Sequence, residues 1–206
     1  QWIDEISNFA DMLKESYETN KKYPFGVIDM QTSENMQMIV FNNFLSAELF
    51  NLRLVDKYCS NPKNKAPYCA HVQHIKRPIF QSGQAYETLK IFKKTKMGKY
   101  ILVHGNTFVD RWCVTFYEGG FNYRLGVDVA KDHETYIFGD TFTQLYIPTK
   151  LCKKVDFVYN NAKTISDVKM PKIYNDIYEK KCKVQLLIFK NPELAEQLRQ
   201  KTLSYF

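Results

Sequence analysis

The residues with the clearest chemical potential are lysines that gather in the middle of the chain. Five of them lie within residues 90–99, and no acidic residue separates them. Aromatic residues such as Phe92 and Tyr100 alternate with these lysines. Ammonium groups neutralise phosphates and exposed rings stack on bases, so this pattern is typical of a polyanion-binding surface. We predict that this surface consists of Lys76, Arg77, Lys90, Lys93, Lys94, Lys96, Lys99, Tyr100 and Arg111.

The uneven distribution of charge along the chain supports the same hypothesis. The protein has 206 residues and a net charge of +7. Residues 57–111 hold eleven basic and two acidic residues, whereas residues 1–56 hold four basic and nine acidic residues. A cluster of like charges often marks a contact surface. Two structural explanations stay open: the lysines form a solvated face that protects a strand edge, or the acidic first segment neutralises them.

A second group of chemically capable residues comprises two cysteines and two histidines. Cys59, Cys69, His71 and His74 lie within sixteen residues, and both residue types bind zinc. Their spacing differs from standard zinc sites, and on a strand His74 would point away from the face that Cys69 and His71 share. We therefore predict no metal site and no cofactor. Free thiols and a Cys59–Cys69 disulfide both stay open.

A third group could support metal-dependent cleavage of phosphodiesters. Asp110, Asp128 and Lys131 provide the two carboxylates and the lysine that suit this chemistry. Asp128 and Lys131 are three residues apart, however, whereas a spacing of two places both side chains on one face of a strand. The chain also lacks a phosphate-binding loop, a dinucleotide fingerprint, a Gly-x-Ser-x-Gly motif and a His-Glu-x-x-His motif. These absences favour a binding domain over an enzyme.

The sequence thus predicts a non-enzymatic binding domain whose partner is an acidic macromolecule: RNA, DNA or an acidic protein. Two alternatives stay open, a secreted carrier with an apolar ligand inside a closed β-sheet, and the metal-dependent nuclease. The five cysteines are odd in number and scattered, and none of the 14 asparagines begins an Asn-x-Ser/Thr sequon. These features favour an intracellular compartment over secretion. No apolar run reaches the roughly 18 residues of a transmembrane segment, and the sequence does not indicate an oligomeric state.

The pattern of expected elements places a sheet at the centre of the protein. Apolar residues at three- and four-residue spacing in residues 2–17 predict an N-terminal helix. A strand is expected at 25–30. Residues 36–58 fit either a helix or two strands with a break near Leu45-Ser46, and propensity favours the helix. The clearest strand signal lies at 112–129, where Gly119-Gly120 would form the turn of a β-hairpin. Further strands are expected at 79, 89–92, 100–103, 135–138, 144–147 and 155–159, with a second hairpin turn at 95–98.

The C-terminal part changes to a helical period. Residues 171–181 are expected to be helical, residues 184–189 to form a strand, and Asn191-Pro192-Glu193 to start a final helix, since Asn caps helices and Pro fits their first position. A crossover helix would join strands near 157 and 186. These elements predict an α+β fold in a single domain of residues 1–206. Its parts are an N-terminal helix, a central mainly antiparallel β-sheet or partly closed barrel, and a C-terminal helix–strand–helix.

Overall fold

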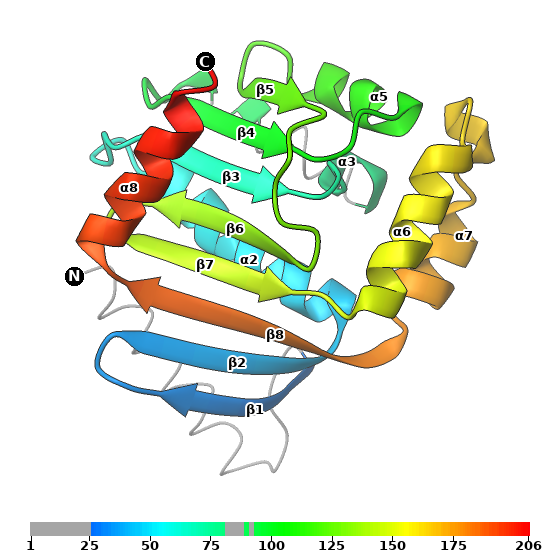
Figure 1. Ribbon diagram of the computed structural model, residues 1–206, viewed down its shortest axis with the longest axis horizontal. Coiled ribbons are helices and arrows are strands. Elements are labelled where there is room, and N and C mark those ends of the chain that lie inside the picture. The colour runs from blue at the N-terminus through cyan, green and yellow to red at the C-terminus, as the bar shows by residue number, and fades with distance from the viewer. Residues whose placement is uncertain (1–25, 81–88, 91–92) are drawn as a thin grey trace.

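The computed structural model describes residues 26–80, 89–90 and 93–206, and it has a mixed α+β fold built on one eight-stranded sheet (Figure 1). The strands follow the order β1-β2-β8-β7-β6-β3-β4-β5 across the sheet. Neighbouring strands are antiparallel from β1 to β3, whereas β3, β4 and β5 run parallel. The strands are β1 (Val27–Thr32), β2 (Met36–Asn43), β3 (Tyr68–Val72), β4 (Lys99–Val103), β5 (Asn122–Leu125), β6 (His133–Phe138), β7 (Thr141–Tyr146) and β8 (Lys181–Lys190).

Helices cover both faces of the sheet and one of its ends. The helical elements are α2 (Phe44–Ser60), α3 (Arg77–Phe80), α5 (Phe108–Phe116), α6 (Thr149–Asn161), η2 (Ile165–Asp167), α7 (Met170–Ile173), η3 (Tyr174–Tyr178) and α8 (Pro192–Leu203). Helix α8 crosses the front of the sheet in Figure 1, α2 lies behind it, and α6 and α7 stand side by side at the right. No helix within the described ranges has the length and apolarity that a membrane span requires.

Two apolar clusters hold these layers together. The larger one joins the sheet to α2 and to the helices at the end of the sheet, and its fully buried members include Ile39, Phe41 and Phe44. The smaller one lies under α8 and contains Cys69, Ile137, Phe142 and Ala195. The sheet therefore has one strongly covered face, while a single helix protects part of the other.

The mainly antiparallel sheet and the C-terminal helix–strand–helix confirm the predicted fold class. Residues 170–178 are helical, β8 follows, and the Asn191 side chain caps α8 by accepting a 3.0 Å hydrogen bond from the Leu194 amide. The sheet is open, with β1 and β5 at its two edges, so the barrel alternative is wrong. The predicted N-terminal helix at 2–17 lies outside the described residues.

The predicted hairpin at 112–129 is wrong, and a helix explains why. Thr107 and Asp110 form a capping box that starts α5, and the buried Val109 and Cys113 lie four residues apart on its inner face. Strand β5 then pairs with β4 in parallel, with Tyr100 opposite Asn122. Parallel neighbours need a crossover connection, which α5 supplies. The 95–98 hairpin turn is also wrong, because Leu89, Lys90 and Lys93 on its N-terminal side are helical, and β4 pairs in parallel with β3.

Three other segments also differ from their predicted structure. Residues 36–58 divide into β2 and α2 instead of forming one helix. Residues 155–159 belong to α6, where Leu151, Val155 and Tyr159 lie four residues apart and are all buried. The predicted crossover between strands near 157 and 186 is therefore wrong. Ile79 lies in α3 and Leu89 is helical, although both were expected in strands.

Candidate nucleic-acid interface

Lys76, one of the predicted surface cations, lies inside the protein. Its side chain is almost fully buried, and its ammonium pairs with the carboxylate of Glu134 and donates to the His74 carbonyl at 3.3 Å. The Tyr136 hydroxyl donates to the other Glu134 oxygen at 2.7 Å. Burial by itself lowers the pKa of Lys76, but the carboxylates of Glu134 and Glu48 outweigh it and raise the pKa above its ordinary value. Lys76 is thus a charged part of the core.

Arg77 and Lys99 are also turned inward. Both terminal nitrogens of Arg77 donate to Asp56, at 2.7 and 2.6 Å, in a bidentate pair. The Lys99 ammonium donates to the Thr95 hydroxyl and the Met97 carbonyl, each at 2.9 Å, and burial lowers its pKa. Together with Lys76, these residues remove three of the eight predicted cations from the surface.

The remaining predicted cations lie on the outside. Lys90, Lys93, Lys94 and Lys96 are exposed, and so is Arg111, which donates to the carbonyl and side chain of Asn106. Among the described residues, no ion pair joins Lys93, Lys94 or Lys96 to a carboxylate. The Lys93 ammonium lies beside Gly119, where an added Cβ would come within 3.7 Å of its Nζ. This contact places Lys93 between the end of α5 and the start of β5.

A groove of about 710 Å³ opens at this edge of the sheet, and we call it the β5 groove. It lies where the C-terminus of α8 comes back beside β4 and β5 (Figure 1). Its lining includes Tyr100 from β4, Glu118, Phe121, Asn122 and Arg124 from the β5 region, and Phe206 at the end of the chain. Cavities of a few hundred cubic ångströms are large enough for ordinary ligands.

Rings and a cation adjoin one another in the β5 groove. The Tyr100 and Phe206 ring centroids are 5.1 Å apart, and the Arg124 guanidinium carbon lies 5.2 Å from the centre of the Phe206 ring. The Arg124 Nε also donates to the Tyr205 carbonyl at 2.8 Å, which fixes the guanidinium beside the ring. The Phe206 side chain is 42% exposed. A base could therefore stack here with a phosphate close to a cation.

Gly98 allows the Tyr100 ring to take its position. A Cβ at Gly98 would come 2.6 Å from a carbon of that ring, so a larger residue would push the ring aside. The sequence predicted Tyr100 but missed Arg124 and Phe206 as partners of the same site. Phe206 is distant in the sequence and enters the groove only because α8 packs across the sheet. No local signal identifies it.

The cysteine and histidine residues do not form a metal site. The described residues contain no group of three or more His, Cys, Asp or Glu side chains arranged to hold a metal ion. All five cysteines are free, and Cys59 and Cys69 are buried. His71 forms a 2.8 Å hydrogen bond with the Thr202 hydroxyl, and burial lowers its pKa to about 4.

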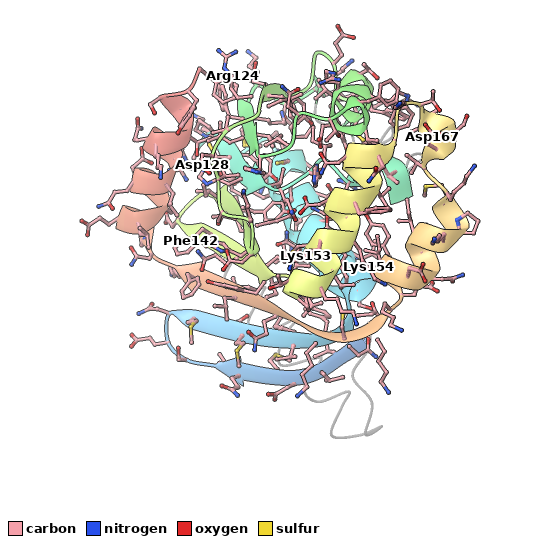
Figure 2. The ribbon with its side chains drawn as sticks, turned by 45° about the vertical axis from the view of Figure 1, so that its right-hand side comes forward. Arg124, Asp128, Phe142, Lys153, Lys154 and Asp167 are labelled. Atoms are coloured by element: carbon pink, nitrogen blue, oxygen red, sulfur yellow. The ribbon has the colours of Figure 1, made fainter. Side chains whose placement is uncertain are left out.

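The acid–lysine group expected for a nuclease is divided between the core and the surface. Asp110 is fully buried, where its two oxygens lie 3.0 and 3.1 Å from His74 Nδ1, and it caps α5 through Thr107. Burial by itself raises the pKa of Asp110, but the hydrogen bonds from His74 and Thr107 outweigh it and lower the pKa. Asp128 (labelled in Figure 2) and Lys131 are exposed on the loop after β5. Asp110 therefore has a structural role, in which it holds His74 in the core and caps the start of α5.

Comparison with known proteins adds little to this picture. No protein-family profile matches the chain, and no curated protein matches it. A solved structure of TrmBL2, described as an archaeal chromatin protein with a novel mode of DNA binding, is similar to it with 10% identity and a TM-score of 0.44. The similarity covers 98% of this chain, which spans 62% of that protein. A likeness this distant carries no argument about function.

Proposed function

We propose that this protein binds single-stranded nucleic acid, with bases on the rings of the β5 groove and phosphates on the adjoining lysines. The observation that carries the proposal is the contact between the exposed Phe206 ring, the Tyr100 ring and the Arg124 guanidinium. Single-strand binding needs stacking platforms next to cations that follow the phosphates, because bases and phosphates alternate along the strand.

The exposed lysines extend the positive charge beyond the groove. Lys93 lies beside Gly119 at the groove wall, and Lys94 and Lys96 follow in the segment that leads into β4. Because these ammonium groups have no carboxylate partner in the described part of the chain, phosphates can neutralise them and release counterions. This uncompensated charge supports a polyanion as the partner.

The rings favour nucleic acid over an acidic protein as that polyanion. A run of carboxylates would engage the lysines alone, whereas bases also use Tyr100 and Phe206. Glu118 contributes a carboxylate to the groove lining, and this negative charge repels a phosphate bound there. Glu118→Gln should therefore tighten binding of a single strand. Polyglutamate should compete for the lysines without protecting the rings.

Photo-crosslinking tests the proposal at the level of the residue. The protein is mixed with a single-stranded oligonucleotide that carries thiolated pyrimidines, irradiated and digested, and the crosslinked peptides are sequenced by mass spectrometry. We expect crosslinks on the peptides that contain Tyr100 and on the C-terminal peptide with Tyr205 and Phe206. With excess polyglutamate present during irradiation, part of the crosslinking to these peptides should remain, because polyglutamate covers the lysines and leaves the rings accessible.

Phe157 provides an internal comparison for the β5 groove, because it is an exposed ring at a different place on the surface. Its side chain is 69% exposed on α6, more than that of Phe206. Collisions without a binding site would mark Phe157 at least as often as the groove. Crosslinks dominated by Phe157, or the absence of crosslinks, would exclude the β5 groove as the binding site.

A further inference from the structure

A second groove, of about 610 Å³, lies between α6 and the segment 167–177, and it shares no lining residue with the β5 groove. We call it the α6 groove. Figure 2 shows Lys153 and Lys154 on α6 and Asp167 on the neighbouring segment. The α6 wall carries Lys150, Lys153, Lys154, Phe157, Val158 and Asn161, which recur at three- and four-residue intervals. One complete face of the helix therefore borders the groove, while its opposite face packs into the core.

The floor of the α6 groove is apolar. Val158 of α6 meets Ile173 and Ile177 of the facing segment across it, and the Phe157 ring stands 69% exposed beside it. Large exposed apolar side chains at a concave surface mark binding sites more often than they occur at random. Segment 174–178 is a π-helical turn, with the Glu179 amide bonded to the Tyr174 carbonyl at 2.8 Å. Such turns are rare and frequently border functional sites.

The rim of the α6 groove is positively charged. Five lysines and two aspartates line it. Asp167 is engaged by its own turn, where it accepts from the amides of Lys163 and Thr164 at 3.0 and 2.8 Å. Within the described ranges, no ion pair joins a lysine of the groove to a carboxylate. Lys154 and Lys169 donate to the carbonyls of Asp176 and Ser166, at 3.1 and 3.2 Å. The lining keeps a net positive charge above an apolar floor, and the first turns of α6 add the positive end of the helix dipole.

We propose that the α6 groove binds a single-chain anionic amphiphile, with its alkyl chain on the floor and its carboxylate or phosphate headgroup on Lys150 and Lys153. This ligand combines the two properties of the groove, since the chain covers Phe157 and the headgroup neutralises the rim. A free fatty acid and a lysophospholipid with an acidic headgroup share this chemistry. The proposal is independent of nucleic-acid binding at the β5 groove.

Fluorescence titration with dansyl-labelled undecanoic acid, below its micellar concentration, tests the proposal. We expect the dansyl emission to rise on binding, and palmitate or lysophosphatidic acid to displace the probe. The competitor that displaces the probe at the lower concentration, palmitate or lysophosphatidic acid, has the preferred headgroup. Hexadecanol, which lacks the charge, and acetate, which lacks the chain, should displace it poorly. Displacement by hexadecanol as effective as by palmitate would overturn the proposal, and so would the absence of binding.

Two variants and two matched controls locate the site. Lys150→Glu combined with Lys153→Glu, and Phe157→Ser, should each weaken probe binding by about tenfold or more, which corresponds to the loss of one good contact. Lys201→Glu and Leu194→Ser change an exposed lysine and an exposed apolar residue on α8, and they should leave binding unchanged. Circular dichroism confirms that each variant is folded. Equal binding by all four proteins, or tighter binding of an acidic amphipathic peptide than of palmitate, would contradict the assignment.

Discussion

Lysines from one short stretch of sequence have two opposite environments in this protein. Lys76 and Lys99 are 5% and 2% exposed, and each has its own hydrogen-bond acceptors in the interior. Lys93, Lys94 and Lys96 lie between them in the sequence and are exposed to solvent. The comparison shows that charge counted along a chain differs from charge presented at its surface. Only the second group can neutralise a polyanion.

The difference arises from where each lysine falls relative to the sheet. Lys76 comes a few residues after the end of β3 and faces the side that α2 covers, where Glu48 and Glu134 meet it. A buried ammonium is tolerated only when hydrogen-bond acceptors compensate for the lost hydration, and for Lys76 these include a carboxylate. Lys93, Lys94 and Lys96 precede β4 and lie outside the core, so water solvates them and a partner can replace that water.

Replacing Lys76 removes the buried cation from this comparison and should have the largest effect on stability. Lys76→Met leaves the fully buried Glu134 without its cation, and we expect it to lower the free energy of unfolding by about 3–5 kcal/mol. Urea denaturation measures this. Adding Glu134→Gln should recover part of the loss, because the uncompensated carboxylate is then removed. A loss below about 1 kcal/mol, the value of an exposed ion pair, would contradict this account.

Glu48 sharpens the comparison through the pH dependence of stability. Burial, opposed by Lys76, raises the pKa of Glu48 from 4.5 to about 7. The native state then binds this proton more tightly than the unfolded state, so Glu48 costs stability as the pH rises from 4.5 towards 7. Glu48→Gln should become more stable relative to the wild type over that range, by a few kcal/mol at most. Thermal or urea unfolding across the range measures the difference.

The stability of Glu48→Gln must be compared with that of the wild type at each pH, because another group changes the stability in the opposite direction. The lowered pKa of His71 makes the native state lose stability as the pH falls from 6.5 towards 4. Lys76, Glu134 and Arg77 are the charged groups around Glu48, and the variant retains all of them. A difference in unfolding free energy that stays constant with pH would show that folding does not raise the pKa of Glu48.

Local chemistry made part of the fold predictable from the sequence. The Asn191-Pro192 start of α8 and the apolar strand at β8 were recognised because caps and short apolar runs are local signals. The hairpin expected at 112–129 is wrong because the capping box of Thr107 and Asp110 starts a helix, and the burial of Val109 and Cys113 on one face of that helix outweighs the turn propensity of Gly119-Gly120. In α6, Val155, Phe157 and Tyr159 have high β propensity, but burial on one helical face decides the structure.

The candidate site was predictable only in part, for a similar reason. Tyr100 and the exposed lysines were expected together because they are neighbours in the sequence. Two of the buried cations are held by carboxylates from other elements, Arg77 by Asp56 and Lys76 by Glu134. Arg124 and Phe206 meet only through the packing of α8. Partners so distant in the sequence leave no local pattern.

Salt-dependent binding by a charge-reversed variant tests the central claim most directly. Lys93→Glu, Lys94→Glu and Lys96→Glu change exposed residues, so we expect the triple variant to retain its unfolding free energy within about 0.5 kcal/mol per site. Fluorescence anisotropy with a labelled single strand should show wild-type affinity that falls steeply with salt. In the triple variant the affinity should be much weaker, and the slope of log K against log salt smaller by about 2. Equal affinity and equal slope for the two proteins would contradict the account.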